Sequence, residues 1–336
     1  MKAMVLRAPN TPLQLEERER PRPGRGEILI RVAACGVCHG DLMTQAGEFP
    51  FVSYPVVPGH EIAGVVEEAG EGVKKLRPGD RVGVSALFST CGRCRHCTTG
   101  FDNLCAHWVW TGMMKDGGYQ QFMVAPGDYA ASLPESLDFA EAAPVMCAGL
   151  TVFSGLKHAG FKPGHKVAVM GLGGLGHFGA LYAKAMGGRL AVISSSPEKE
   201  AEARSLGAEL FIRAPNEALA DQLRAWEGGA DIILATPPSV EPMSAAFPGL
   251  APDGTMVVLG AGPGQLAVAP MPLIMGRRRL MGSPAGSRRD LQEALDFAAK
   301  HRFHPKVKRF PLERANDVLT EMQTGHMSGR AVLMAA

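Results

Sequence analysis

The order of apolar and polar positions divides the chain into two parts. In the first 150 residues, short apolar or alternating stretches lie between turns rich in Gly and Pro, a pattern typical of β-strands. From about Ala140, apolar runs alternate with stretches in which apolar residues recur every three or four positions, which is the helical spacing. Such alternation predicts a parallel sheet with right-handed crossovers. In the first part we expect strands at 27–33, 61–68, 80–84 and 119–124.

The second part predicts a domain of regular β–α units. After it, the sequence predicts two more helices (289–300 and 312–323) and a terminal strand. This tail has no place in the predicted parallel sheet, so we expect it to return to the first domain. The fold class is therefore α/β, with 151–283 forming a doubly wound sheet and 1–150 with 284–336 forming a mainly β domain. We expect strands at 167–170, 190–193, 210–212, 231–234 and 255–260, and helices near 174–186, 197–207, 216–225 and 239–247.

The segment 166–199 contains a glycine pattern in a strand–helix–strand context. The apolar run 167–170 is followed by the glycines of G-x-G-x-x-G, then by a helical stretch and by the second apolar run 190–193. Alone, these glycines could form an ordinary strand–helix turn. In this context they predict a turn whose backbone N–H groups and helix N-terminus bind the pyrophosphate of a dinucleotide. The predicted contact residues are Gly171, Leu172, Gly173, Gly174, Leu175 and Gly176.

The charge balance excludes some classes of partner. The chain has 35 basic and 33 acidic residues, too even a balance to indicate nucleic acid or a membrane surface. The N-terminal segment lacks the apolar core of a signal peptide, and no stretch has membrane-spanning length. A cytoplasmic location is therefore expected. Since a cytosolic chain rarely keeps disulfides, its seven cysteines favour metal binding or catalysis.

Four cysteines are closely spaced as C-x2-C-x2-C-x7-C. Four thiolates at such spacing can enclose a zinc ion tetrahedrally and leave no position for water, which indicates a structural site. Disulfides and a nucleic-acid-binding zinc ribbon are the alternatives, disfavoured by compartment and by charge balance respectively. The predicted ligands are Cys91, Cys94, Cys97 and Cys105.

Several motifs occur together in an order and spacing that resemble one family. The chain is similar to the zinc-dependent medium-chain alcohol dehydrogenases, in particular to the cinnamyl and aryl alcohol dehydrogenase branch with its microbial aldehyde-reductase relatives. The resemblance covers essentially the whole chain and implies a GroES-like catalytic domain beside a Rossmann domain. The motifs are CGVCHGD (35–41), PGHEIAGVV (58–66), CGRCRHCTTGFDNLC (91–105), DGGYQQF (116–122), MCAGLTV (146–152), GLGGLG (171–176), DLQEALDFAA (290–299) and GRAVL (329–333).

The resemblance implies a catalytic zinc bound by residues that spacing alone could not group. Two thiolates and one imidazole leave the fourth corner of a tetrahedron open for substrate. Glu61 would be an occasional or outer ligand, and Asp41 would accept a hydrogen bond that fixes the histidine tautomer. Zinc in this family polarises the carbonyl that accepts hydride from the nicotinamide. The implied catalytic ligands are Cys38, His60 and Cys147.

The resemblance also implies contacts to the cofactor. Thr151 would lie against the nicotinamide ring, His39 near the phosphates or ribose, and Arg330 near the pyrophosphate. Gly260 and Ser283 complete the expected cofactor set.

The choice of dinucleotide follows from charge. NAD selection usually needs a carboxylate about 20 residues past the glycines, but the chain has Ser194, Ser195 and Ser196 there, with no acid before Glu198. Hydroxyls near Lys199, with Arg204 nearby, would instead bind a 2′-phosphate. An N-cap function of Ser196 explains that residue but not the missing acid. NADP(H) is therefore favoured over NAD(H).

One departure from the family concerns proton transfer. A hydroxyl residue two positions after the first zinc cysteine, and often a His three positions further on, normally pass the proton to bulk water. Here these positions are Gly40 and Met43. A water chain with His39 could replace them, alcohol oxidation could be slow, or the substrate could be an iminium or activated alkene.

The expected substrate is a small alcohol or aldehyde, and the expected assembly is a homodimer or homotetramer. Phe49, Leu87, Phe88 and Trp110 are candidate pocket residues, and equally candidates for plain core, that would suit aromatic or medium aliphatic substrates. The competing classes are a zinc-independent reductase of the quinone-reductase type, which lacks these cysteines, and a non-catalytic nucleotide-binding or structural protein.

Overall fold

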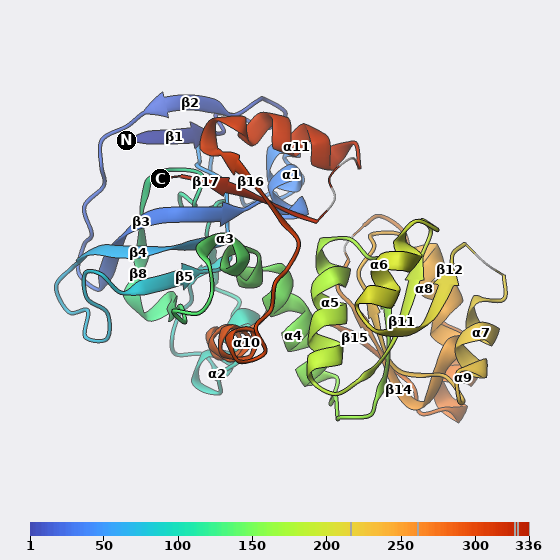
Figure 1. Ribbon diagram of the computed structural model, residues 1–336. Coiled ribbons are helices and arrows are strands. Elements are labelled where there is room, and N and C mark those ends of the chain that lie inside the picture. Colours follow the sequence, from blue (N-terminus) through green and yellow to red (C-terminus); the bar gives the residue numbers. More distant parts are fainter. Residues whose placement is uncertain (216, 261, 326, 328, 336) are drawn as a thin grey trace. The chain divides into compact units, whose positions relative to one another are not determined.

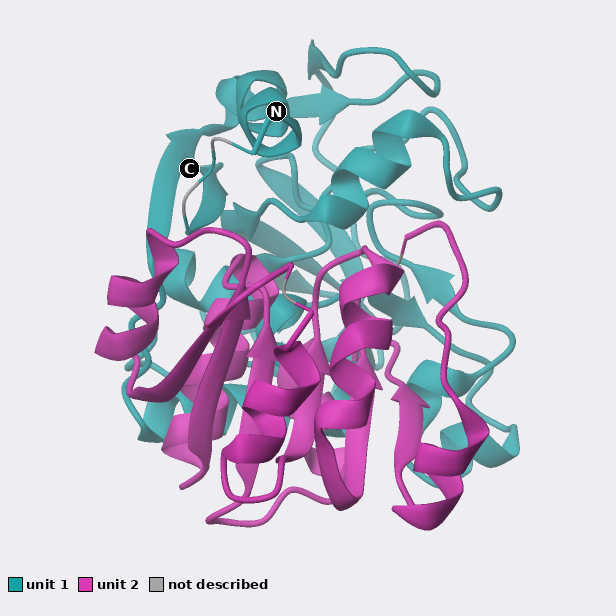
Figure 2. Ribbon diagram, turned by 90° about the vertical axis from the view of Figure 1, so that its right-hand side faces the viewer, with its two compact units in different colours: residues 1–150, 286–336 teal, residues 151–285 magenta. Residues whose placement is uncertain are grey.

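The protein folds into two compact units. The computed structural model describes residues 1–215, 217–260, 262–325, 327 and 329–335. Unit 1 comprises Met1–Leu150 and Gly286–Ala336, and unit 2 comprises Thr151–Ala285 (Figures 1 and 2). The boundary between 283 and 284 that the sequence predicts lies two residues before the division at 285.

Unit 1 is built on a seven-stranded sheet with the order β16-β17-β3-β4-β5-β9, and β8 also pairs with β3. The central strand is β3 (Glu27–Gly36), which pairs antiparallel with β4, β8 and β17. It extends past the predicted end at 33 because its last residues pair with β17. Further strands of unit 1 are β1 (Lys2–Val5), β2 (Gln14–Glu17), β4 (Ile62–Ala69), β5 (Arg81–Val84), β6 (Leu87–Ser89), β7 (Val109–Trp110), β8 (Phe122–Pro126), β9 (Ala130–Ser132), β16 (Val307–Pro311) and β17 (Arg330–Met334).

The sheet of unit 1 encloses an apolar core together with α11. Ile28, Ile30 and Val32 alternate along β3 and are fully buried, as expected of a strand with one face on a core, and Val318 and Leu319 of α11 join the same cluster. The helices of unit 1 are α1 (His39–Ala46), α2 (Arg95–Thr98), α3 (Phe139–Ala142), α10 (Arg288–Lys300) and α11 (Ala315–Gln323), while α4 (Ala148–His158) contains the division between the units.

Unit 2 is a six-stranded sheet with the order β12-β11-β10-β13-β14-β15, in which all neighbours run parallel. The chain enters at β10, builds outward to β12 and then continues from β13 to β15 on the other side, which is the doubly wound arrangement. The predicted parallel sheet is confirmed. Its elements are β10 (Lys166–Met170), α5 (Gly174–Ala185), β11 (Arg189–Ser194), α6 (Lys199–Ser205), β12 (Ala208–Arg213), α7 (Leu219–Ala225), β13 (Ala230–Ala235), α8 (Val240–Ala246), β14 (Leu250–Val258), α9 (Pro270–Met275) and β15 (Arg279–Gly282).

Two elements of unit 2 were not predicted. The helix α9 has six residues and two prolines, and β15 has four residues without a buried face. Neither is long enough to show a periodicity in the sequence.

Among the described residues, no single helix is long and apolar enough to cross a membrane. One bent pair, Phe139–Met146 with Ala148–His158, meets the criterion by length and composition only.

Candidate active site

Two cysteines, a histidine and a glutamate of unit 1 meet at one point. The ligand atoms of Cys38, His60, Glu61 and Cys147 all lie within 4.8 Å of one another, and the two sulfurs are 3.7 Å apart. Two thiolates bound to one tetrahedral zinc at about 2.3 Å would be separated by roughly 3.8 Å. The donor set and its spacing therefore fit zinc.

Three chain segments deliver these ligands. Cys38 is the N-cap of α1, and the Asp41 side chain accepts a hydrogen bond from its backbone N–H at 2.9 Å. His60 and Glu61 directly precede β4, and Cys147 directly precedes α4. The ligands thus lie at the ends of regular elements, which fixes the backbone positions from which their side chains extend.

Of the two thiols, Cys38 is the one that ionises first. The hydrogen bond to Cys38 and burial raise the pKa of Cys147 well above the ordinary thiol value. A hydrogen bond from Cys147 and the nearby His60 hold the pKa of Cys38 well below the ordinary thiol value, against the effect of burial. Burial lowers the pKa of His60, but the Asp41 carboxylate and Cys38 together outweigh it, so the pKa lies well above its usual value. Without a metal, the site therefore favours a Cys38 thiolate beside an imidazolium, and a cation would replace that imidazolium proton.

Glu61 supplies a carboxylate oxygen without a partner. The side chain is fully buried, and its Oε1 pairs with the Arg330 guanidinium, while Oε2 has no hydrogen-bond partner among the described residues. Buried polar atoms are almost always paired. One carboxylate oxygen of Glu61 also lies within 4.8 Å of the two sulfurs and an imidazole nitrogen. A carboxylate that retains an unpaired oxygen so near these ligands is consistent with a cation close by.

Asp41 contacts His60 and two further residues close to it. Its Oδ1 lies 3.3 Å from His60 Nδ1 and accepts from the Gly59 N–H at 3.2 Å. Its Oδ2 accepts from the Tyr119 hydroxyl at 3.0 Å. The sequence predicted that Asp41 faces His60 but did not find Tyr119, although that residue ends the DGGY part of one quoted motif.

The segment that carries Tyr119 packs directly on the loop that carries His60. Gly59 has a φ of 96°, and a Cβ there would lie 2.5 Å from the Tyr119 ring. A Cβ on Gly117 would lie 2.0 Å from the Gly59 carbonyl oxygen. Only glycine permits this approach. The glycines in Pro58-Gly59-His60 and Asp116-Gly117-Gly118 are therefore explained by the close packing of the two segments.

We expect Tyr119→Phe to weaken zinc binding at the site of Cys38, His60 and Cys147 by about tenfold, the lower end of the range for residues that support ligands. The hydroxyl is fully buried, burial and the Asp41 charge raise its pKa well above 10, and it therefore remains a donor to Asp41. Zinc release to a chelator measures the effect. Tyr54→Phe is the control, since Tyr54 donates to the Thr44 carbonyl of the same unit; equal release rates in the two variants would contradict the expectation.

The second cysteine group is also assembled. The sulfurs of Cys91, Cys94, Cys97 and Cys105 lie within 4.8 Å of one another. Backbone N–H groups of Arg93 and Cys94 lower the pKa of Cys91 to about 6, which favours the thiolate that zinc needs. Four sulfurs at these distances suit a closed tetrahedral site, so this group fits the predicted structural zinc.

Two residues that the family resemblance places near the cofactor, His39 and Arg330, differ in burial. His39 is the first residue of α1, is exposed, and lines a surface pocket together with Leu42, Met43 and residues of α11. Arg330 is buried and pairs with Glu61. Their contacts to a cofactor remain predictions.

In unit 2, the predicted nucleotide residues follow the carboxyl ends of neighbouring strands. Gly171 follows β10 with a φ of 75°, and a Cβ on Gly176 would lie 1.8 Å from the Gly171 carbonyl oxygen. Gly173 is the N-cap of α5, which comprises Gly174 and Leu175 in its first turn, and Leu172 between the glycines is buried. This is the geometry in which backbone N–H groups bind a pyrophosphate.

The remaining residues that the sequence predicts to bind the cofactor divide into two groups. Ser194 ends β11, and its Oγ accepts from the Ser196 N–H at 3.2 Å, with Ser195 between them. Lys199 begins α6 and pairs with Glu202 at 2.8 Å. Gly260 follows β14 and Ser283 follows β15, so these residues share one edge of the sheet. Thr151, in contrast, lies buried in α4.

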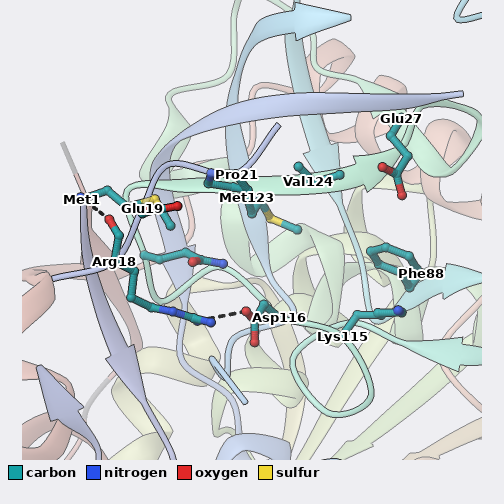
Figure 3. Close-up of a pocket in the computed structure, with 11 residues that line it drawn as sticks. Met1, Arg18, Glu19, Pro21, Glu27, Phe88, Lys115, Asp116, Met123 and Val124 are labelled. Atoms are coloured by element: carbon teal, nitrogen blue, oxygen red, sulfur yellow. Dashed lines mark hydrogen bonds and ion pairs between the residues drawn. The ribbon is translucent and has the colours of Figure 1, made fainter. Parts of the chain in front are cut away.

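The candidate pocket residues of unit 1 fall into two places in the structure. Trp110 pairs with Leu87 across the β6–β7 ladder, and its ring contacts that of Trp108. The Trp108 ring lies 4.8 Å from the ring of Phe51, and Phe51 stacks on Phe49. Sequence reasoning missed Phe51 and Trp108. Phe88 instead lines a cavity of about 410 Å³ (Figure 3), whose lining includes Lys115 and Asp116 but none of the four zinc-ligand candidates.

Comparison with known proteins assigns the family. Residues 24–135 match the alcohol dehydrogenase GroES-like domain, and residues 174–300 match the zinc-binding dehydrogenase domain. The chain is 40% identical to an alcohol dehydrogenase of Geobacillus stearothermophilus over 99% of this chain and 98% of the relative. The chain belongs to the zinc-dependent medium-chain alcohol dehydrogenase family, so the predicted family and fold class are confirmed.

Two solved structures are similar over nearly the full length. A cinnamyl alcohol dehydrogenase from Sorghum bicolor has a TM-score of 0.90 at 34% identity and covers 99% of this chain and 97% of its own. CAD from Helicobacter pylori, complexed with NADP(H), has a TM-score of 0.90 at 27% identity with the same coverage. The chain is thus an alcohol dehydrogenase with cinnamyl alcohol dehydrogenase-like neighbours.

Proposed function

We propose that the protein is an NADP(H)-dependent zinc enzyme that interconverts primary alcohols and aldehydes of aromatic or medium aliphatic type. The observation that carries the proposal is the convergence of Cys38, His60, Glu61 and Cys147 within 4.8 Å. The catalytic domain would comprise 1–150 and 284–336, and the dinucleotide domain 151–283.

Each residue of the site would have a distinct role. Zinc, when bound, acts as a Lewis acid on the substrate oxygen. Cys38, His60 and Cys147 would hold the ion, and Asp41 would hold His60 through Nδ1 and thereby leave Nε2 to bind it. Glu61 would remain an outer ligand, while Cys91, Cys94, Cys97 and Cys105 would hold a second, structural zinc.

The NADP(H) preference rests on the end of β11. Ser194, Ser195 and Ser196 place hydroxyls where a carboxylate would repel a 2′-phosphate, and the similar Helicobacter pylori structure is a complex with NADP(H). NAD(H) is the alternative. The aromatic substrate class rests on the contiguous rings of Phe49, Phe51, Trp108 and Trp110 in unit 1, since aromatic rings pack favourably on one another.

The absence of a hydroxyl at Gly40 favours a second candidate, the reduction of iminium or activated alkene substrates. Gly40 lies close to His60: a Cβ at this position would be 3.2 Å from His60 Cε1. The nearby Thr44 hydroxyl donates to the Gly40 carbonyl at 2.7 Å. Proton transfer in an alcohol dehydrogenase would therefore rely on water.

We expect Gly40→Ser to change kcat for aldehyde reduction by less than tenfold, because water already transfers the proton. If the reaction instead lacked a needed proton donor, a serine hydroxyl at this position would raise the rate about 10²–10⁴-fold. Rates and pH profiles of Gly40→Ser and of Gly40→Ala, which adds the Cβ without the hydroxyl, distinguish the cases. A gain of a hundredfold confined to the serine variant would contradict water-mediated transfer.

A homodimer or homotetramer is proposed from the edge of the unit 2 sheet. The edge strand β15 and the adjacent α9 expose large apolar side chains, which on a monomer would be unusual as a group, and an uncovered edge strand invites pairing. The exposed residues are Met271, Ile274, Met275 and Leu280. Light scattering of the purified protein measures the mass of the assembly.

A cytoplasmic location is proposed because the metal sites need reduced thiols.

Metal analysis with an oxidation assay tests the proposal as a whole. We expect two zinc ions per chain and faster turnover with NADPH than with NADH on a panel of aldehydes. Turnover of iminium or activated alkene substrates without aldehyde turnover would support the second candidate. Turnover without zinc would indicate a zinc-independent reductase, and zinc without turnover of any of these substrates would indicate a non-catalytic protein.

A further inference from the structure

The end of β11 has a charged neighbour on the next strand. Ser194 on β11 and Arg213 on β12 are register partners in the parallel sheet, and the Ala214 N–H donates to the Ser194 carbonyl at 2.9 Å. Arg213 is therefore fixed beside the first residue of the serine segment.

Register and burial show which face of the sheet Arg213 occupies. Val169 faces α5, since its Cγ1 would lie 3.3 Å from a Cβ on Gly176, and Val169 aligns with Val192 and Phe211 across the strands. Ser194 and Arg213 lie two positions further along β11 and β12. Because side chains alternate along a strand, both lie on the face that α5 covers.

The opposite face is apolar. Ile193, Ile212 and Ala214 belong to one buried cluster there. Arg213 thus lies at the carboxyl edge of the sheet, on the same side as the glycine turn that precedes α5.

The two cations that the sequence singled out are already paired. Lys199 forms an ion pair with Glu202 at 2.8 Å, and Glu202 also contacts His177 Nδ1 at 3.3 Å. Arg204 pairs with Glu200 at 3.1 Å and donates to the Glu209 carbonyl at 2.8 Å. Because an acidic partner already neutralises each of these cations, neither pair carries much net positive charge to attract a 2′-phosphate.

Arg213 differs from both. It is exposed, and its guanidinium makes no hydrogen bond or ion pair with the described part of the chain. A guanidinium can bind a phosphate through two parallel hydrogen bonds, whereas an ammonium binds it as a point charge.

We propose that Arg213 is a specificity-determining residue that binds the 2′-phosphate of NADP(H) beside Ser194. The proposal rests on the proposed NADP(H) preference and extends it to a residue outside the serine segment. Ser194, Ser195 and Ser196 provide hydroxyl groups, and Arg213 provides the uncompensated positive charge.

Calorimetric titration of the zinc-loaded enzyme with adenosine 2′,5′-bisphosphate (2′,5′-ADP) and with 5′-AMP tests this inference. The two probes share adenosine and one 5′-phosphate and differ only in the 2′-phosphate. We expect Arg213→Ser to weaken 2′,5′-ADP binding about tenfold or more, as loss of a hydrogen-bonded charge pair does, and 5′-AMP binding less than twofold. Arg213→Lys should recover part of the loss.

Arg224→Ser is the matched control, since Arg224 is an exposed arginine of unit 2 that pairs with Asp221; it should bind both probes like the wild type. If the wild type does not prefer 2′,5′-ADP over 5′-AMP, the NADP(H) preference itself is wrong. If the wild type prefers 2′,5′-ADP and Arg213→Ser keeps that preference, only the role of Arg213 is wrong. A drop of the same size for both probes would also overturn the specific role.

Discussion

Cys147→Ala is expected to leave one zinc ion per chain and to lower kcat/KM for aldehyde reduction at least 10³-fold. The variant removes one of the two sulfurs that lie 3.7 Å apart, and Cys38, His60 and Glu61 alone then face the metal position. A Lewis acid contributes several kcal/mol to such a reaction, and about 4 kcal/mol corresponds to 10³-fold. Metal analysis and steady-state kinetics on the same preparation measure both quantities.

Cys35→Ala is the matched control for this variant. Cys35 is a buried thiol of the same unit, three residues before Cys38, and burial raises its pKa well above the ordinary thiol value. It belongs to neither group of candidate metal ligands, so its removal should leave two zinc ions and nearly full activity. A Cys147→Ala protein that keeps both ions, or a Cys35→Ala protein that loses one, would contradict the assignment.

The two cysteine groups show how far sequence reasoning extends. The group from Cys91 to Cys105 lies within one short segment of the chain, so chain connectivity alone holds its members near one another, and their spacing is informative. Cys38 and Cys147 are 109 residues apart, and the fold of the sheet brings them together. Spacing could not reveal this pair, and only the resemblance to a family indicated it.

The contacts that sequence reasoning missed are contacts between distant segments. Tyr119 reaches Asp41 because Gly59, Gly117 and Gly118 let two loops approach, and that approach depends on tertiary packing. Arg330 pairs with Glu61 across 269 positions of sequence. The glycine turn after β10, in contrast, was predicted correctly because strand, turn and helix are consecutive in the chain.

Arg330→Met is expected to have the largest effect on stability. Arg330 and Glu61 are both buried and form an ion pair. Removing one partner of a buried pair leaves an uncompensated charge and costs about 3–5 kcal/mol. Arg309→Met is the control, because Arg309 forms an exposed ion pair with Asp138 on the surface of the same unit, and exposed pairs contribute about 0–1 kcal/mol. Urea unfolding at pH 8, with a chelator present, measures the difference.

The cost of Arg330→Met should also depend on pH. Burial raises the pKa of Glu61 from 4.5 to about 7, although Arg330 opposes this shift. A carboxyl group whose pKa is raised on folding adds stability that is fully present below pH 4.5, declines above it, and is lost as the pH passes the folded value. Without Arg330 the folded pKa should rise further, so the variant should lose more stability at pH 8 than at pH 5.5, where Glu61 is protonated. Adding Glu61→Gln to Arg330→Met should recover much of the loss at pH 8, since no buried charge then remains unpaired. An equal cost at both pH values, or no recovery in the double variant, would show that Arg330 stabilises the unit by packing and not by its charge.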